Sequence, residues 1–155
     1  MNYDIQEHRH RFAVWAASRA VARGFTGTTN VKRAIEASDV RDVAFSSPTK
    51  WPVEGVDELH EKWVDQILAQ LERDGVFTEL RDKKNLLRKE QSYGRAAKIV
   101  AVYLKTCLLM RPDVDHEFLS LIHPPIDRTL LQALSAQPTF SKYKSRWMAI
   151  TWTQL

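Results

Sequence analysis

Hydrophobic residues recur at helical spacing along much of this chain. Within residues 56–73 the repeating apolar positions are Val56, Leu59, Trp63, Ile67 and Leu71. Intervals of three and four residues predict an amphipathic helix with one apolar face. Residues 94–110 are apolar on nearly every side, apart from Lys98 and Lys105. Such a helix is expected at the centre of a domain.

Further helices are predicted over residues 4–23, 30–37, 115–122 and 127–135. In the first, an apolar stripe comprises Phe12, Trp15, Ala16 and Ala20. Asn30 is a suitable cap for the second. Residues 38–55 contain two prolines and a glycine, which predicts a connection. Residues 77–92 suit a short helix or a loop, and the tail from residue 140 suits a last helix or a strand-like stretch.

The chain shows no internal repeat and no series of alternating strands. Its 155 residues suit one domain that buries a sizeable core. We therefore predict an all-α protein, a single-domain orthogonal multi-helix bundle over residues 1–155, with the apolar helix near 94–110 at its centre.

Composition indicates the cellular compartment in which this protein is expected. The single cysteine, Cys107, excludes an internal disulfide and is expected to be a buried, inert thiol. The first residues have no apolar core of a signal peptide. The longest apolar run is broken by Lys105 and is too short to cross a bilayer. These features predict a soluble, cytoplasmic protein with no membrane partner.

Charge is unevenly distributed. Residues 81–98, the basic segment, carry seven bases and two acids, whereas residues 31–80 carry six bases and eleven acids. The bases are Arg81, Lys83, Lys84, Arg88, Lys89, Arg95 and Lys98. The segment has two interpretations: a solvated helix face, or a surface that follows the phosphates of a nucleic acid. Tyr93 within it can stack on a base.

The stretch "HPPIDRTLL" places Asp127 where a helix is predicted to begin. Asp is a favoured N-cap, and two prolines before a helix are common. The structural interpretation of Asp127 is therefore a cap alone. The functional interpretation is a carboxylate held at a working position.

The functional interpretation comes from a resemblance. "YGRAAKIVAVYLKTCLLM" followed by "PPIDRTLLQAL" resembles the second half of the helix-hairpin-helix DNA glycosylase superfamily, over residues 94–134. The resemblance implies that Gly94 is the turn glycine of a phosphate-binding hairpin and that Asp127 is the catalytic carboxylate. In bifunctional members of this superfamily, a lysine begins the central helix. The residue nearest to that position in this chain is Ala96, and Lys98 lies two positions further on. "YGRAAK", "YLK" and "HPPIDR" also resemble stretches of small bacterial proteins without an assigned activity.

Glycosylase chemistry has two requirements. Cleavage of the bond to a base develops oxocarbenium character, which a nearby carboxylate stabilises. The base must also leave the stack and enter an aromatic or apolar pocket. Tyr103, Trp147 and Trp152 are candidates for such a wall and equally suit a hydrophobic core.

Other chemistry has weaker support. Arg111 and His116 have the Arg-x4-His spacing of the all-α HEPN ribonucleases. His8 and His10 are two residues apart, so they diverge by about 200° on a straight helix and cannot share a metal ion. His60 and His123 lack a recognisable set of ligand partners. No metal and no cofactor is predicted.

Three functions remain open. The first is a non-enzymatic interaction or scaffold protein that binds a protein partner or itself. The second is a DNA-binding protein distantly like the helix-hairpin-helix glycosylases, with phosphate contacts from Gly94, Arg95, Lys98 and the four bases Lys83, Lys84, Arg88 and Lys89. The third is a HEPN-like ribonuclease. We do not expect the protein to be an enzyme. If it has an enzymatic activity, we expect that activity to be like that of a DNA glycosylase.

Overall fold

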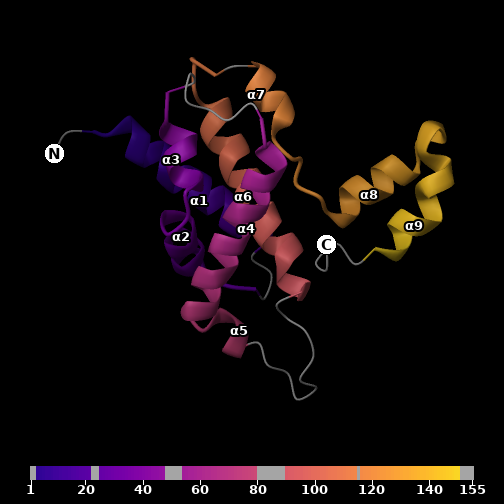
Figure 1. Cartoon of the computed structure of the whole chain (residues 1–155), viewed down its shortest axis with the longest axis horizontal. Helices are drawn as coiled ribbons and strands as arrows, with labels where there is room; N and C mark the ends of the chain where they lie inside the picture. Colours follow the sequence, from indigo (N-terminus) through magenta and orange to yellow (C-terminus); the bar gives the residue numbers. More distant parts are fainter. Residues whose placement is uncertain (1–2, 22–24, 48–53, 80–89, 115, 151–155) are drawn as a thin grey trace.

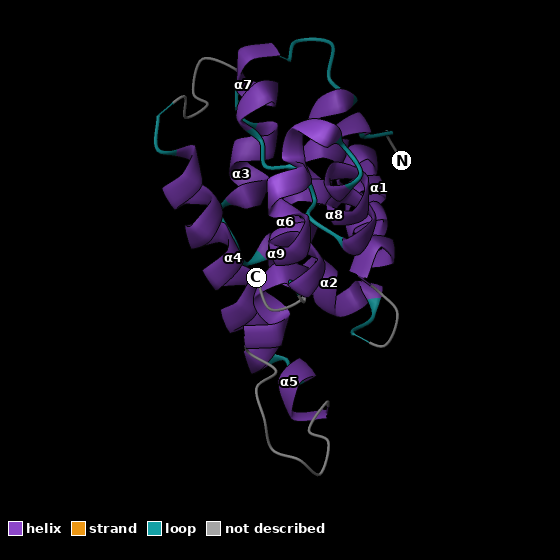
Figure 2. Ribbon diagram, turned by 90° about the vertical axis from the view of Figure 1, so that its right-hand side faces the viewer, coloured by secondary structure: helices purple, strands orange, loops and turns teal. Residues whose placement is uncertain are grey.

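The computed structural model describes residues 3–21, 25–47, 54–79, 90–114 and 116–150. All regular structure in these ranges is helical (Figure 2), which confirms the predicted all-α multi-helix bundle. The elements are α1 (Ile5–Val21), α2 (Thr28–Glu36), α3 (Val40–Phe45), α4 (Val56–Arg73), α5 (Val76–Glu79), α6 (Glu90–Leu109), α7 (His116–Leu121), α8 (Arg128–Ser135), the 3-10 helix η2 (Pro138–Tyr143) and α9 (Lys144–Ala149).

Helix α6 is the centre of the fold, as its all-round apolar sequence predicts. Helices α1, α3 and α4 pack against it (Figure 1). Ile99, Val100, Leu104 and Leu108 are fully or almost fully buried. Cys107 is buried too, and burial raises the pKa of its thiol to about 12. Within the described ranges, no helix has the length and apolarity needed to cross a membrane.

The apolar stripe predicted for α1 is wrong. Phe12 and Trp15 are about half exposed, at 46% and 52%, and their rings stack on the outer side of the helix. The buried face instead consists of His10, Ala13, Val14, Ala17, Ser18 and Val21. Because these side chains are mostly small, α1 lies closely against α6 along its length.

A polar contact is enclosed between α1 and α6. His10 Nδ1 lies 2.8 Å from the hydroxyl of Tyr103, and both residues are fully buried. His10 Nε2 lies 3.3 Å from a carboxylate oxygen of Glu36. A neutral ring that donates from Nε2 and accepts the Tyr103 proton at Nδ1 satisfies both contacts. Tyr103 is therefore a core residue, as the core interpretation predicts.

Two predictions before α4 are corrected. The N-cap of α2 is Gly27, and Asn30 lies inside the helix, where its amide donates to the Thr26 hydroxyl. The predicted connection of residues 38–55 contains α3, which buries Val40 and Ala44. A helix of six residues has a weak periodic signal, because it spans fewer than two turns.

The last helices form a small lobe beside the bundle (Figure 1). Helices α8, η2 and α9 pack mainly on one another. Trp147 is half-buried in this lobe against Phe140 and Tyr143. The described tail is therefore helical up to Ala149, in η2 and then α9, and not strand-like. Trp152 lies outside the described residues.

Candidate functional site

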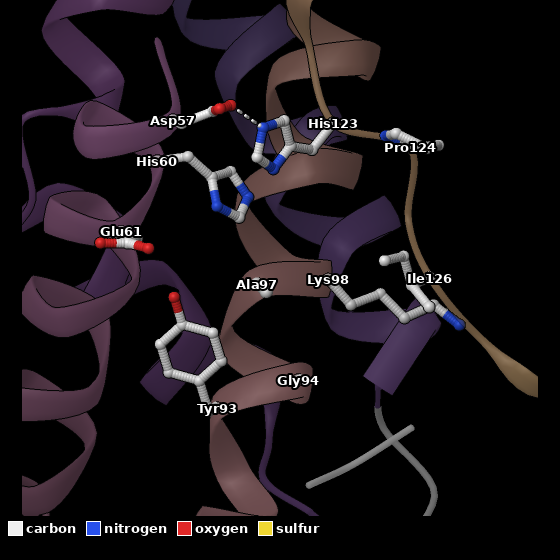
Figure 3. A pocket seen from close by; sticks show the side chains of 10 residues that line it. All are labelled: Asp57, His60, Glu61, Tyr93, Gly94, Ala97, Lys98, His123, Pro124 and Ile126. Atoms are coloured by element: carbon white, nitrogen blue, oxygen red, sulfur yellow. Dashed lines mark hydrogen bonds and ion pairs between the residues drawn. The ribbon is translucent and has the colours of Figure 1, made fainter. Parts of the chain in front are cut away.

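A pocket of about 440 Å³ lies where α4, the first half of α6 and the connection between α7 and α8 meet (Figure 3). Its lining comprises Asp57, His60, Glu61, Tyr93, Gly94, Ala97, Lys98, His123, Pro124 and Ile126. This volume falls within the roughly 300–1,000 Å³ typical of small-molecule sites. The pocket therefore has the size of a ligand-binding site.

The wall from α4 carries an acid and a histidine from the first turns of the helix. Gly55 precedes α4 with a φ of 70°, a left-handed conformation that glycine adopts without strain. Asp57 follows in the first turn, where the helix dipole favours a carboxylate. His60 comes three residues later, so it lies on the same side of the helix. The two side chains face the α7–α8 connection together (Figure 3).

His123 joins the connection to α4. Its Nε2 lies 2.6 Å from Asp57 Oδ1, and its ring lies over the His60 ring with centroids 4.3 Å apart and planes tilted by 32°. The Asp57 carboxylate accepts this hydrogen bond from His123 Nε2. A carboxylate therefore fixes the orientation of one imidazole, and that imidazole covers the second.

His60 is the most enclosed polar group of the pocket. It is 7% exposed, and its Nε2 is buried without a hydrogen-bond partner. Burial, and secondarily the proximity of His123, lowers its pKa to about 4. The ring is therefore neutral at physiological pH. A buried nitrogen without a hydrogen-bond partner destabilises the folded state.

The wall from α6 is mainly apolar. Tyr93 and Ala97 are half-buried and lie one turn apart on α6. Burial, and then the carboxylates of Glu61 and Asp65, raises the pKa of the Tyr93 hydroxyl. Ile126, 43% exposed, completes this side from the connection. A flat aromatic ligand would find apolar surface here.

Asp127 begins α8 next to the pocket. Its Oδ1 accepts from the Leu130 amide at 2.9 Å, which confirms the predicted N-cap, and its Oδ2 lies 2.9 Å from Lys98 Nζ. The Leu130 amide, and then Lys98, lowers the pKa of this carboxyl group. The pocket lining includes Lys98 but not Asp127. The carboxylate is therefore ionised and held at the edge of the site.

The predicted phosphate contacts Gly94, Arg95 and Lys98 lie within α6. Gly94 is buried inside α6, because the helix begins four residues earlier, at Glu90. Its amide lies beyond the first four, which lack intrahelical partners, so Gly94 is not the turn of a phosphate-binding hairpin. The Arg95 guanidinium lies 5.0 Å from the centroid of the Phe25 ring, whereas Lys98 pairs with Asp127. Lys83, Lys84, Arg88 and Lys89 lie outside the described residues.

Arg111 has a structural role. Its guanidinium donates to the backbone carbonyls of Ala44 and Ser46, at 3.0 and 2.9 Å, and pairs with Asp113. The side chain is 8% exposed. These bonds hold the end of α3 against the end of α6, a geometry that does not favour Arg111 as a ribonuclease residue. His116 is the first residue of α7.

The pairing of His60 with His123 was not predicted from the sequence. His60 and His123 are separated by more than sixty residues, and each alone has no spacing signature. In the described part of the chain, no group of three or more His, Cys, Asp or Glu side chains is arranged to hold a metal ion. The two rings lie side by side in the pocket lining, and Asp57 accepts a hydrogen bond from His123.

No protein-family model, curated protein or solved structure matches this chain.

Proposed function

We propose that the protein binds DNA and receives one unstacked base in the pocket between α4 and α6. The observation that carries this proposal is the position of the pocket on α6. Tyr93, Gly94, Ala97 and Lys98 line it, and α6 begins directly after the most basic part of the basic segment.

The proposal assigns different parts of the nucleic acid to different parts of the protein. The basic segment provides the attraction for phosphates, which is independent of base sequence. The pocket provides apolar surface and polar side chains, which suit a base removed from the stack. The resemblance to helix-hairpin-helix glycosylases supports DNA as the nucleic acid, although Gly94 does not form a hairpin turn.

Binding without bond cleavage is the form of the proposal that the geometry favours. Both carboxylate oxygens of Asp127 already have partners, the Leu130 amide and the Lys98 ammonium. This arrangement is sufficient to explain an acid at that position. A catalytic role for Asp127 remains a separate prediction, tested by comparing base release by the wild type and by Asp127→Asn.

Fluorescence anisotropy with labelled single-stranded and duplex DNA tests the proposal. We expect the affinity to fall several-fold when the salt concentration doubles, because each neutralised phosphate releases counterions. Lys83→Gln/Lys84→Gln should weaken binding and reduce the salt dependence. Lys142→Gln/Lys144→Gln removes the same charge from the C-terminal lobe and serves as the matched control.

Two outcomes overturn DNA binding. One is an affinity that does not change with salt. The other is an equal loss in both double variants, because the basic segment then has no special role.

A second candidate function is self-association, the interaction role left open by the sequence. The stacked and half-exposed Phe12 and Trp15 favour it, because large apolar side chains on a surface mark interaction sites. Arg19 lies one turn from Trp15 and is exposed, whereas Glu58 and Asp65 are exposed on α4. A basic aromatic face on one copy therefore complements an acidic face on another.

Sedimentation velocity over a range of concentrations tests self-association. A wild-type dimer that Trp15→Ser converts to a monomer supports it, with the exposed Met148→Ser as the control. A monomer at all concentrations excludes it.

A further inference from the structure

The rings of His60 and His123 pack against each other at the α4 wall of the pocket (Figure 3). Their centroids are 4.3 Å apart, and His60 Nε2 is buried without a hydrogen-bond partner. His60 is 7% exposed, whereas 38% of the His123 side chain is exposed. The His123 ring therefore covers His60 on the side of the α7–α8 connection.

This closed arrangement suits a neutral His60 and not a protonated one. A protonated imidazole has two N–H donors, and each needs an acceptor or water. Nε2 has no acceptor in this position. Burial, and secondarily the proximity of His123, accordingly lowers the pKa of His60 to about 4. A proton on His60 is therefore more stable once the His123 ring has moved away and water reaches Nε2.

Two acids of α4 lie on the same wall as the histidines. Asp57 accepts a hydrogen bond from His123 Nε2 at 2.6 Å, and this bond holds the connection against α4. Asp57 also favours a proton on His60, but burial and the proximity of His123 have the larger effect on that pKa. Glu61 follows one turn after Asp57 and is exposed. The acids therefore hold His123 without making a charged His60 stable in the closed arrangement.

The opposite wall adds one phenol and one ammonium group. Tyr93 is neutral, because burial raises the pKa of its hydroxyl. Lys98 pairs with Asp127 at 2.9 Å, and its side chain points away from the two histidines (Figure 3). The residues that the connection adds next to His123 in the lining, Pro124 and Ile126, are uncharged. The contact between the rings therefore depends on the two histidines and on Asp57.

We propose that His60 and His123 form a latch that acid opens: a proton on His60 displaces the His123 ring and releases the α7–α8 connection from α4. The connection lines the pocket, so its release widens the entrance. The open form takes up the proton with a pKa near 6.5, against about 4 in the closed form. Acidification from pH 7.5 to pH 5 therefore shifts the equilibrium toward the open form by up to about 30-fold. The role of the latch in admitting a base rests on the proposed function.

NMR spectroscopy of the protein without DNA tests the latch. Nuclear Overhauser contacts between the carbon-bound ring protons of His60 and His123 report the closed form, and these protons do not exchange with water. We expect the contacts to be present at pH 7.5 and to disappear as His60 takes up its proton between pH 6.5 and pH 4. Unchanged methyl signals of the buried Ile35 and Leu108 show that the protein remains folded over this interval.

One variant and a matched control identify the group that carries the proton. His60→Phe keeps a ring against His123 but removes the titrating nitrogens, so its ring contact with His123 should persist at pH 5. His8→Phe replaces an exposed histidine of α1 and should open as the wild type does. If His60→Phe does not fold, the wild type alone decides, because the loss of the contact and the chemical-shift change of the His60 ring must have the same midpoint pH.

Two results overturn the latch. One is a contact between His60 and His123 that persists until the protein unfolds. The other is a contact that is lost without protonation of His60, or that is lost at the same pH in His60→Phe.

The effect on DNA is measured separately, by fluorescence anisotropy with a duplex that has one unpaired nucleotide and with a fully paired duplex. An unpaired nucleotide leaves the stack at a smaller cost, and the ratio of the two affinities cancels the added charge. We expect this ratio to rise between pH 7.5 and pH 5 by at most about 30-fold in the wild type and to stay constant in His60→Phe. A constant ratio in the wild type overturns the role of the latch in admitting a base. Absence of binding to both duplexes overturns the proposed function, and the NMR contact still decides the latch.

Discussion

Lys98 Nζ lies 2.9 Å from Asp127 Oδ2, and this ion pair joins the central helix α6 to the first residue before α8. The Lys98 side chain is 12% exposed and that of Asp127 is 31% exposed, so the pair is partly shielded from water. The same carboxylate caps α8 through the Leu130 amide. One acid therefore fixes both the start of α8 and its position beside the pocket.

Substitutions of Asp127 separate these two contributions. Asp127→Ala removes both the cap and the ion pair, and loss of the cap alone costs about 1 kcal/mol. Asp127→Asn retains a cap but not the charge, so we expect it to destabilise the protein less. Urea unfolding at pH 7 measures both. Equal losses in the two variants would show that the cap makes no contribution.

Acid should weaken the Asp127 contacts. The pKa of this carboxyl group is lower in the folded protein than in the unfolded chain. Its contribution is therefore complete above the unfolded pKa, near 4, and is lost as the pH falls through the lower folded value. Urea unfolding between pH 5 and pH 2 should show a smaller loss of stability in Asp127→Asn than in the wild type.

His60 makes stability depend on pH in a higher range. Its pKa is about 4 in the folded protein, against 6.5 for an ordinary histidine. Above pH 6.5 both states are neutral; below it the unfolded chain takes up the proton first. We expect a loss of about 3 kcal/mol between pH 6.5 and pH 4, from 1.36 kcal/mol per pKa unit. His60→Phe should lose less over the same interval, and NMR titration of the His60 ring should give the folded pKa directly.

The buried contact between His10 and Tyr103 should depend on the hydroxyl oxygen of Tyr103. Tyr103→Phe leaves His10 Nδ1 without a donor inside the core, which costs about 1–3 kcal/mol. Tyr93→Phe makes the same chemical change at a half-buried residue of the pocket and should cost less. Thermal unfolding measures both variants, and a Tyr103→Phe variant as stable as the wild type contradicts this account.

Arg111 should be needed for the end of α3. Arg111→Met removes donors from the Ala44 and Ser46 carbonyls, and each bond to a charged donor contributes about 1.5–3 kcal/mol. We expect faster hydrogen exchange in α3 and lower global stability. Asp113→Asn keeps both carbonyl bonds and is the control. Unchanged exchange in Arg111→Met would show that α3 is held by its apolar contacts.

The helices that sequence predicts well are those with long apolar repeats. Trp63, Ile67 and Leu71 of α4 are buried as predicted, and so are Ile99, Val100, Leu104 and Leu108 of α6. Asp127 was predicted as a cap because capping is local: its chemistry depends on residues within one turn. Local and strongly periodic features are therefore predictable from this chain.

Features that depend on the neighbours of a helix were not predictable. The large apolar residues of α1, Phe12 and Trp15, suggest a buried stripe, yet α6 contacts the face with the smaller side chains. Which face of α1 is buried depends on how closely each face packs against α6. That closeness depends on the shape of the α6 surface, which the sequence of α1 does not contain. His60 and His123 form a pair only because the fold brings α4 and the α7–α8 connection together.

The contact between Asp57 and His123 has a consequence for synthesis of the protein on the ribosome. The two residues are 66 positions apart, and α6 is translated between them. Chains grow from the amino terminus at about 5–20 residues per second. His123 follows the last residue of α6 by 14 positions, so the helices around α6 can assemble about one to three seconds before His123 is added. A nascent chain released before residue 123 would contain the buried histidine of α4 but would lack the imidazole that covers it.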